Sequence, residues 1–155
     1  FTSLISFLES YVYHFPAKFA SAMSYGWREA IDFIKQEEGN YTEIVVSKTF
    51  SEPQIFVAFY KPVDPSFSQS ESKDWRRYEA QKLLFLDQLG EYRLGKYTFR
   101  NINFASDKEK RQTLLVGKPA EFPQNIVARQ TIYYPNQGPA ILIYDPAAQV
   151  YAKAF

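Results

Sequence analysis

A continuous β-branched run, Ile44-Val45-Val46, restricts the fold of this chain more than any other feature of its sequence. A run of this kind is typical of a strand that is covered on both faces, as in a parallel sheet. Patterns with helical periodicity lie on either side of it. Residues 25–65 therefore predict a helix, a turn, a buried strand, a turn and a second helix.

The helix before this strand has the clearest periodicity. Trp27, Ala30, Ile31 and Ile34 occupy positions i, i+3, i+4 and i+7, which place an apolar stripe along one helical face. Gly39 follows the stripe, and a glycine at such a point commonly adopts the left-handed conformation that ends a helix. We expect the helix to end there.

The helix after the strand is bounded by two prolines. Pro53 suits the first turn of a helix, because the amide hydrogen that proline lacks has no partner at that position. Pro62 disfavours helical geometry in the residue before it, so the largely apolar segment 55–60 is expected to end there.

The rest of the chain alternates between polar, helical and extended patterns. We expect, in chain order, a loop at 66–73, a helix at 74–89, a strand at 97–104 with a bulge near Asn101, a turn at 107–112, a strand at 113–116, a helical turn at 120–122, and a hairpin of strands 127–134 and 140–144. This order predicts an α/β fold with a mixed, mostly parallel sheet flanked by helices and a C-terminal antiparallel hairpin.

A chain of 155 residues has the length of one domain. Within it we distinguish an N-terminal segment at 1–24, a core at 25–146 and a tail at 147–155. The net charge of +1 comes without a basic run, so no nucleic-acid partner is expected. The sequence contains no cysteine, which excludes disulfides and thiolate metal sites.

The N-terminal segment carries apolar residues at helical spacing, with serines and Glu9 on the opposite side. Two interpretations stay open. The segment is an amphipathic helix that docks on the core of its own domain, or it is the juxtamembrane continuation of a transmembrane helix. In the second case Tyr11, Tyr13 and Phe15, beside His14, would suit the headgroup level of a membrane.

Reactive side chains are sparse. His14 is the single histidine, so we expect it to be structural or exposed rather than part of a metal cluster or a catalytic relay. The predicted strand 44–46 is followed by the bulky residues 47–50, which do not suit a phosphate-binding loop. The acidic pairs in 37–38 and 107–109 are expected to be solvated helix ends. No catalytic residue, metal ligand or cofactor is predicted.

One segment combines charge with aromatic rings. Trp75, Arg76, Arg77 and Tyr78 place two arginines between two aromatic side chains, a combination that suits a sugar or a phosphate. We predict these four residues as candidate ligand-binding residues. The alternative is a helix with one buried face and one charged face, in which the same residues need no ligand.

Several motifs follow one another in an order that is found elsewhere. They are Tyr13, Phe15-Pro16, Tyr25-Gly26-Trp27-Arg28-Glu29-Ala30, Ile34, Ile44-Val45-Val46-Ser47, the aromatic segment 53–60, Asp64-Pro65, Gly95-Lys96-Tyr97-Thr98-Phe99-Arg100, Leu114-Leu115-Val116-Gly117 and the final hairpin. Their order over residues 11–145 resembles the segment after the last membrane helix in bacterial membrane glycosyltransferases of the protein-O-mannosyltransferase-like class, which includes the lipid A aminoarabinose transferases.

The resemblance implies a function that the residues themselves do not specify. In that class a polytopic membrane region transfers sugar from a polyprenyl-phosphate donor, and its catalytic acidic residues lie in an early loop that has no counterpart here. The resemblance therefore implies a non-catalytic extracytoplasmic C-terminal domain, held at the cell membrane by upstream transmembrane helices. Its implied partners are that transmembrane region and a glycan or lipid-linked acceptor, and its implied role is acceptor recognition or regulation. The alternative is a domain that only stabilises the membrane part.

Two other functions stay open. The first is a stand-alone extracellular carbohydrate-binding or interaction module, which would expose an aromatic platform such as Trp75 with Tyr78 or Tyr133 with Tyr134. The second is a small cytosolic α/β protein with its own ligand. Hydrophobic segments of about 20 residues upstream in the parent gene would favour the membrane enzyme over both.

Overall fold

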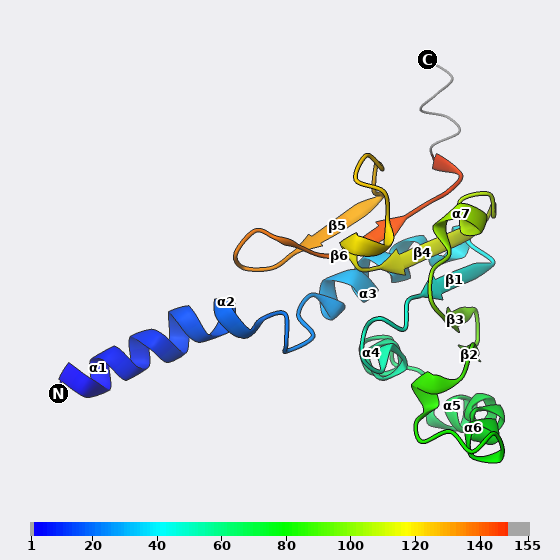
Figure 1. Cartoon of the computed structure of the whole chain (residues 1–155), viewed down its shortest axis with the longest axis horizontal. Coiled ribbons are helices and arrows are strands. Elements are labelled where there is room, and N and C mark those ends of the chain that lie inside the picture. The colour runs from blue at the N-terminus through cyan, green and yellow to red at the C-terminus, as the bar shows by residue number, and fades with distance from the viewer. Residues whose placement is uncertain (1, 149–155) are drawn as a thin grey trace.

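The computed structural model describes residues 2–148, which form a mixed α/β body and a long helix that projects from it (Figure 1). Residues 149–155 of the expected tail lie outside the described residues. In the described chain six strands form one sheet, in the order β2-β3-β1-β4-β6-β5. The strands are β1 (Glu43–Val46), β2 (Tyr92–Leu94), β3 (Tyr97–Phe99), β4 (Thr113–Gly117), β5 (Gln130–Tyr133) and β6 (Pro139–Tyr144).

Strand β1 lies at the centre of this sheet. It pairs in parallel with β3 on one side and with β4 on the other, so that Ile44 stands opposite both Tyr97 and Leu114. The outer pairs, β2 with β3, β4 with β6 and β5 with β6, are antiparallel. The structure thus confirms the α/β class, the mixed sheet and the C-terminal hairpin. The expectation that the sheet is mostly parallel is wrong, since two of the five strand pairs in the described chain are parallel.

Both faces of β1 are covered, which accounts for its continuous apolar run. Ile44 and Val46 pack into the larger core cluster together with Ile34 of α3 (Trp27–Glu37). Val45 points to the other face, where it joins a smaller cluster with Phe122. The side chains of Ile44, Val45 and Val46 are completely buried.

The helical segments of the described chain are mostly short. They are α1 (Thr2–Glu9), the π-helical turn η1 (Ser10–His14), α2 (Phe15–Phe19), α3 (Trp27–Glu37), α4 (Pro53–Tyr60), α5 (Pro65–Glu71), α6 (Arg77–Ala80), α7 (Phe104–Asp107) and the 3₁₀ turns η2 (Glu38–Asn40), η3 (Ser72–Arg76), η4 (Leu86–Gln88) and η5 (Pro119–Glu121). The helices expected around the central strand are confirmed as α3 and α4.

The expected end of α3 at a left-handed Gly39 is wrong. Gly39 lies inside the 3₁₀ turn η2, and the glycines with positive φ in the described chain are Gly26 and Gly95. A 3₁₀ turn tightens the helix end and pairs its last carbonyl groups, so a left-handed residue is not needed.

The expected loop at 66–73 is also wrong, because α5 and the start of η3 occupy this range. The carboxylate of Asp64 accepts hydrogen bonds from the backbone amides of Ser66, at 2.7 Å, and Phe67, at 3.2 Å, and Pro65 occupies the first helical position. Such a cap with a proline behind it stabilises a helix start even before a serine-rich sequence.

The continuous helix expected at 74–89 is broken. Helix α6 ends at Ala80, and Lys82 then takes a left-handed φ of 56°, which no continuing helix accommodates. The chain returns to helical geometry only in the single turn η4.

The strand expected at 97–104 is shorter than predicted, because β3 ends at Phe99 and α7 begins at Phe104. No bulge occurs at Asn101; the register shift lies between Ile132 and Tyr133 in the C-terminal hairpin. Strand β2 was not predicted. It forms a tight hairpin with β3, and Gly95 in the turn between them has a φ of 58°.

The N-terminal helix does not dock on the core, so that interpretation is wrong. Segments α1, η1 and α2 follow one another with helical backbone at their junctions, and Figure 1 shows them extending away from the body. The exposed fraction of their large apolar side chains runs from 37% at Phe15 to 73% at Tyr13. Within residues 2–148 no helix combines the length and the apolar character that crossing a bilayer requires.

Gly26 lies where the N-terminal segment enters the body, directly before α3, and its replacement tests how closely the backbone packs there. Gly26 has a φ of 92°, and a Cβ atom there would lie 2.8 Å from Cγ2 of Ile132. We expect Gly26→Ala to lower the free energy of unfolding by about 2–4 kcal/mol, from backbone strain together with overpacking. Gly39→Ala is the control, since no atom lies within 4 Å of its added methyl group. Urea denaturation of both variants measures this, and equal stabilities would contradict it.

A buried ion pair between Arg100 and Asp107 stabilises the segment after β3, on the second face of the sheet. Asp107 was expected to be solvated, but only 1% of its side chain is exposed. Its carboxylate accepts two hydrogen bonds of 2.8 Å from the Arg100 guanidinium and one of 2.9 Å from the backbone amide of Asn103. Burial alone would raise the pKa of Asp107, but these donors outweigh it and hold the pKa below its ordinary value.

This ion pair makes stability depend on acid. Because the folded pKa of Asp107 lies below the ordinary value of 3.8, its contribution is present above that pH and is lost as the pH falls further. We expect Asp107→Asn to cost about 2–4 kcal/mol at neutral pH and to flatten the decline in stability below about pH 4. Asp87→Asn, at an exposed carboxylate, is the control. Thermal melts between pH 2 and pH 7, read by circular dichroism, would contradict this if both variants followed the unmodified chain.

Candidate functional site

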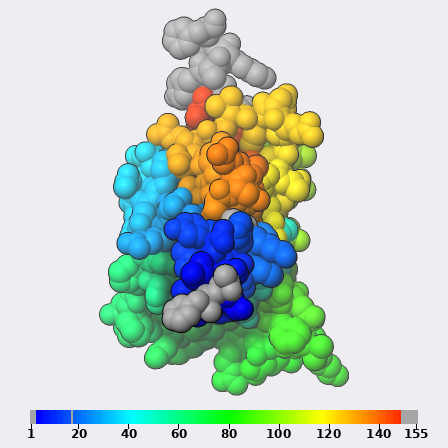
Figure 2. All heavy atoms as spheres, turned by 90° about the vertical axis from the view of Figure 1, so that its left-hand side faces the viewer, coloured from blue at the N-terminus to red at the C-terminus, as the bar shows by residue number. Residues whose placement is uncertain are grey.

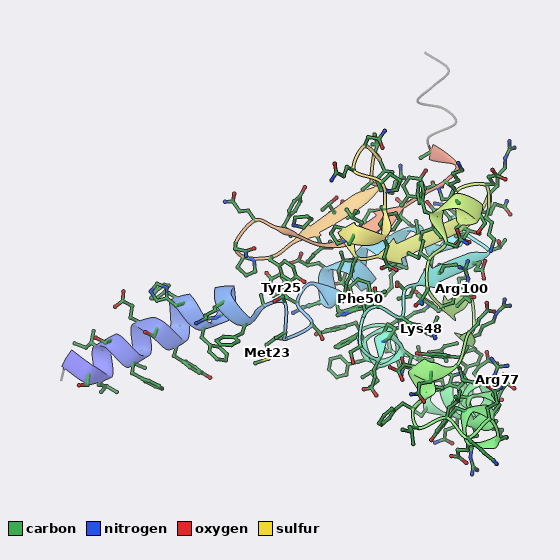
Figure 3. The ribbon with its side chains drawn as sticks, viewed as in Figure 1. Met23, Tyr25, Lys48, Phe50, Arg77 and Arg100 are labelled. Atoms are coloured by element: carbon green, nitrogen blue, oxygen red, sulfur yellow. The ribbon has the colours of Figure 1, made fainter. Side chains whose placement is uncertain are left out.

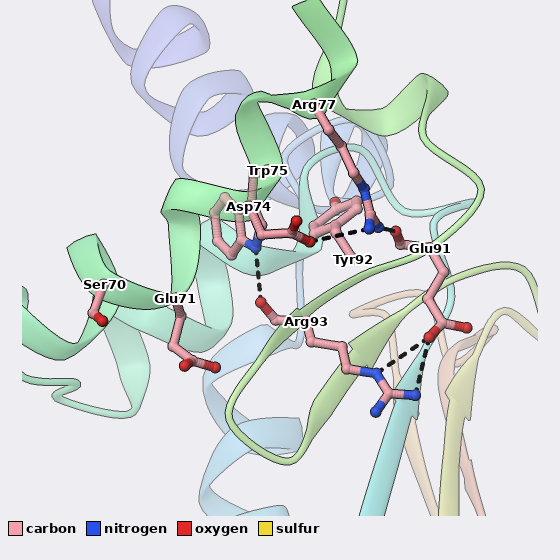
Figure 4. A pocket seen from close by; sticks show the side chains of 8 residues that line it. All are labelled: Ser70, Glu71, Asp74, Trp75, Arg77, Glu91, Tyr92 and Arg93. Atoms are coloured by element: carbon pink, nitrogen blue, oxygen red, sulfur yellow. Dashed lines mark hydrogen bonds and ion pairs between the residues drawn. The ribbon is translucent and has the colours of Figure 1, made fainter. Parts of the chain in front are cut away.

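The predicted ligand-binding segment lies beside the hairpin of β2 and β3, where it encloses a pocket of about 330 Å³ (Figure 4). We call this the hairpin pocket. Helices α5, η3 and α6 supply one wall, and β2 with the residue before it supplies the other. The lining residues are Ser70, Glu71, Asp74, Trp75, Arg77, Glu91, Tyr92 and Arg93.

Trp75 joins the two walls. Its indole Nε1–H donates a hydrogen bond of 2.8 Å to the backbone carbonyl of Arg93. Its ring meets Tyr92 edge to face, with ring centroids 5.4 Å apart. Since Tyr92 is buried and donates its hydroxyl to Gln54 at 2.7 Å, Trp75 is anchored to the core rather than free to swing.

Arg77 spans the pocket. Its Nη1 lies 3.0 Å from the Asp74 carboxylate, and its Nη2 donates to the backbone carbonyl of Glu91. Figure 4 shows the guanidinium held between these two groups. The charge of Arg77 is therefore largely met within the protein, which lowers its value as a phosphate receptor.

The remaining charged groups leave the hairpin pocket slightly acidic. Glu71 accepts a hydrogen bond of 3.1 Å from the backbone amide of Gly95, and Glu91 accepts one of 3.0 Å from Arg93. Three carboxylates and two guanidinium groups line the pocket, for a net charge of −1. Paired carboxylates and guanidinium groups beside an indole suit a neutral polyhydroxylated ligand better than an anion.

The structure brings together only part of the predicted site. Trp75 and Arg77 line the hairpin pocket, whereas Arg76 and Tyr78 do not. Arg76 is exposed and pairs with Glu79 at 3.3 Å, and Tyr78 packs partly buried against the core. For Arg76 and Tyr78 the alternative interpretation applies: Arg76 lies on a charged face and Tyr78 on a partly buried face, and neither needs a ligand.

The contribution of the hairpin to the pocket was not predicted from the sequence. Glu91, Tyr92 and Arg93 enter it because β2 folds back onto η3, and β2 itself was missed. A signal was present: Tyr92 and Leu94 alternate with polar residues just before Gly95, which is the pattern of a short strand leading into a turn.

Two other polar clusters have structural roles. Lys48 donates to the carbonyl groups of Asp87, at 2.8 Å, and Leu89, and burial lowers its pKa. The hydroxyls of Ser47 and Thr49 donate to the Glu121 carboxylate at 2.6 Å and 2.8 Å. Among residues 2–148 no three His, Asp or Glu side chains gather in a way that could hold a metal ion.

Comparison with protein-family models, with curated proteins and with solved structures found no match to this chain.

The neighbouring residues Trp75 and Arg76 should contribute unequally to stability, because Trp75 is bonded to the hairpin and Arg76 forms an exposed ion pair. Trp75→Phe keeps an aromatic ring but removes the hydrogen bond to the Arg93 carbonyl, so we expect a loss of about 1 kcal/mol in the free energy of unfolding. Arg76→Gln removes only an exposed pair and should change it by less than about 0.5 kcal/mol. Guanidinium denaturation followed by circular dichroism measures both, and an equal effect at the two positions would contradict the anchoring role of Trp75.

Proposed function

We propose that this chain is the non-catalytic extracytoplasmic C-terminal domain of a polyprenyl-phosphate-sugar-dependent membrane glycosyltransferase of the protein-O-mannosyltransferase-like class. The order of motifs over residues 11–145 supports the family. The observation that carries the membrane part of the proposal is the N-terminal helix, whose large apolar side chains follow one another along the helix and lie outside the core cluster of the body.

The uncovered side chains form a continuous aromatic ladder. Phe7, Tyr11, Phe15 and Phe19 are spaced four residues apart, and successive ring centroids lie 6.0, 5.7 and 4.6 Å from one another. An exposed apolar ladder of this kind costs free energy in water and requires a partner surface.

The polar residues of the same helix favour a membrane interface as that partner. Serines and Glu9 occupy the side opposite the ladder, while Tyr13, His14 and Lys18 lie toward the body end. Tyrosine and lysine side chains near the end of an apolar helix are typical of the headgroup level, where an apolar stem and a polar tip are both accommodated. The upstream transmembrane region of the same protein is the proposed attachment, at the extracytoplasmic face.

The hairpin pocket gives this domain a proposed role in acceptor recognition. Its indole, carboxylates and guanidinium groups suit a glycan or the sugar part of a lipid-linked acceptor. A stand-alone extracellular carbohydrate-binding module is the second candidate, favoured by the same pocket but leaving the aromatic ladder unexplained.

Vesicle binding tests the membrane part. We expect the chain to co-sediment with phosphatidylcholine vesicles, and Phe7→Ser with Phe15→Ser to weaken the partition constant at least about tenfold, because each ring loses roughly 1.5–3 kcal/mol of burial. Leu84→Ser with Val127→Ser is the matched control, since these apolar side chains are as exposed but lie on the body. Equal binding by both double variants would overturn the role of the helix.

Glycan titration tests the pocket part. Trp75 and the buried Trp27 are the two tryptophans of the chain, so a ligand in the hairpin pocket should change the Trp75 fluorescence alone. We expect the change on titration with oligosaccharides to vanish in Trp75→Phe and to persist in Arg76→Gln. Glycan binding without vesicle binding would favour the stand-alone module. If no glycan of a broad panel changed the fluorescence, the proposed role in acceptor recognition would be wrong.

A further inference from the structure

A second pocket, of about 310 Å³, lies where the N-terminal helix joins the body. We call it the helix-base pocket. Figure 3 shows Tyr25 and Phe50 at this junction, and Figure 2 looks onto the face from which the helix projects. Its lining residues are Ser21, Ala22, Ser24, Tyr25, Trp27, Thr49, Phe50, Ser51, Lys118, Tyr134 and Ala140.

The pocket occupies the edge of the sheet at which parallel α/β folds bind ligands. Thr49 and Phe50 follow β1, and Lys118 follows β4, so both strands point their carboxyl ends at it. The strands that follow β1 in the chain, β2 and β3, lie on one side of it, and the strands that follow β4, β5 and β6, lie on the other side. The space between two such strands is a topological switch point, where the diverging loops leave a crevice.

One cation faces this crevice without an acidic partner. Within residues 2–148 no carboxylate lies at ion-pair distance from Lys118, and its Nζ sits 5.5 Å from the centroid of the Phe50 ring. The neighbouring Glu121 is already engaged, since it accepts hydrogen bonds from Ser47, Thr49 and the backbone amide of Lys118 at 2.6–2.8 Å. The charge of Lys118 is thus available to a ligand.

Hydroxyl groups surround the same space. Ser21, Ser24 and Ser51 line the pocket, and their hydroxyls form no hydrogen bond with any described residue; the same holds for the hydroxyls of Tyr25 and Tyr134. The two tyrosine rings stand with their centroids 6.2 Å apart. The pocket therefore offers hydroxyl donors and one ammonium group beside aromatic walls.

We propose that the helix-base pocket binds a phosphate group that carries a small organic substituent. Phosphate oxygens accept hydrogen bonds from several hydroxyls at once, while the lysine ammonium balances their charge as a point charge. The aromatic walls accommodate the substituent. This phosphate group belongs either to a free phosphomonoester or to the headgroup of an anionic phospholipid. Only the headgroup rests on the proposed attachment of the helix to a membrane.

Nuclear magnetic resonance titration of the whole chain tests this site with glycerol 3-phosphate as the probe. We expect shifts of the backbone amides of Ser21, Thr49 and Ser51 that saturate with one dissociation constant. Lys118→Gln should weaken that constant by about three- to tenfold, a moderate factor because the side chain is partly screened by solvent. Lys108→Gln is the matched control, an exposed lysine at the end of α7 that loses the same charge.

Vesicles that contain phosphatidylglycerol in phosphatidylcholine distinguish the two sources. A headgroup site predicts a preference for these vesicles over pure phosphatidylcholine that disappears in Lys118→Gln and survives in Lys108→Gln. A free phosphomonoester site predicts the glycerol 3-phosphate shifts without that preference. The proposal is overturned if the amides around the pocket do not respond to either probe, or if the two lysine variants behave alike. Loss of vesicle binding in the double variant Phe7→Ser with Phe15→Ser tests only the membrane role of the N-terminal helix and leaves the phosphate site of the helix-base pocket untouched.

Discussion

The burial of β1 on both of its faces is the constraint on which the rest of the structure depends. Ile44 and Val46 need the helical layer of α3 and α4, and Val45 needs the chain that follows β3 and β4 on the other side. A strand covered in this way must pair at both edges, because an exposed edge would leave its backbone groups without partners. Strands β3 and β4 supply this pairing, and because both run parallel to β1, crossover segments connect the three strands and contribute walls to the two pockets.

The parts of the fold that could be predicted from the sequence are those in which a local pattern and the tertiary requirement agree. In α3 an apolar stripe packs on the sheet, and in β6 an apolar run pairs in a hairpin, so the patterns alone were sufficient. Helix α5 was missed because its stabilisation comes from a capping contact of Asp64 with two backbone amides, which a serine-rich composition conceals. Strand β2 was missed because its alternation, with Tyr92 and Leu94 on either side of Arg93, extends over only three residues and is therefore a weak signal.

The candidate site was predictable in its residue types and not in its geometry. Trp75 and Arg77 enter the hairpin pocket while the neighbouring Arg76 points to solvent, and this difference depends on the phase of the 3₁₀ turn η3 relative to β2. The helix-base pocket was not predicted at all. Its residues come from segments between positions 21 and 140 that only the sheet topology brings together.

The central claim is that the body folds around its own core while the N-terminal helix requires an apolar surface from outside. Amide hydrogen exchange, read residue by residue with and without lipid vesicles, tests this claim most directly. A helix without tertiary contacts is marginal in water, so amides over residues 4–15 should exchange fast in buffer and slowly with vesicles, while those of β1 stay slow in both. Protection of the helix in buffer as strong as that of β1 would contradict the account.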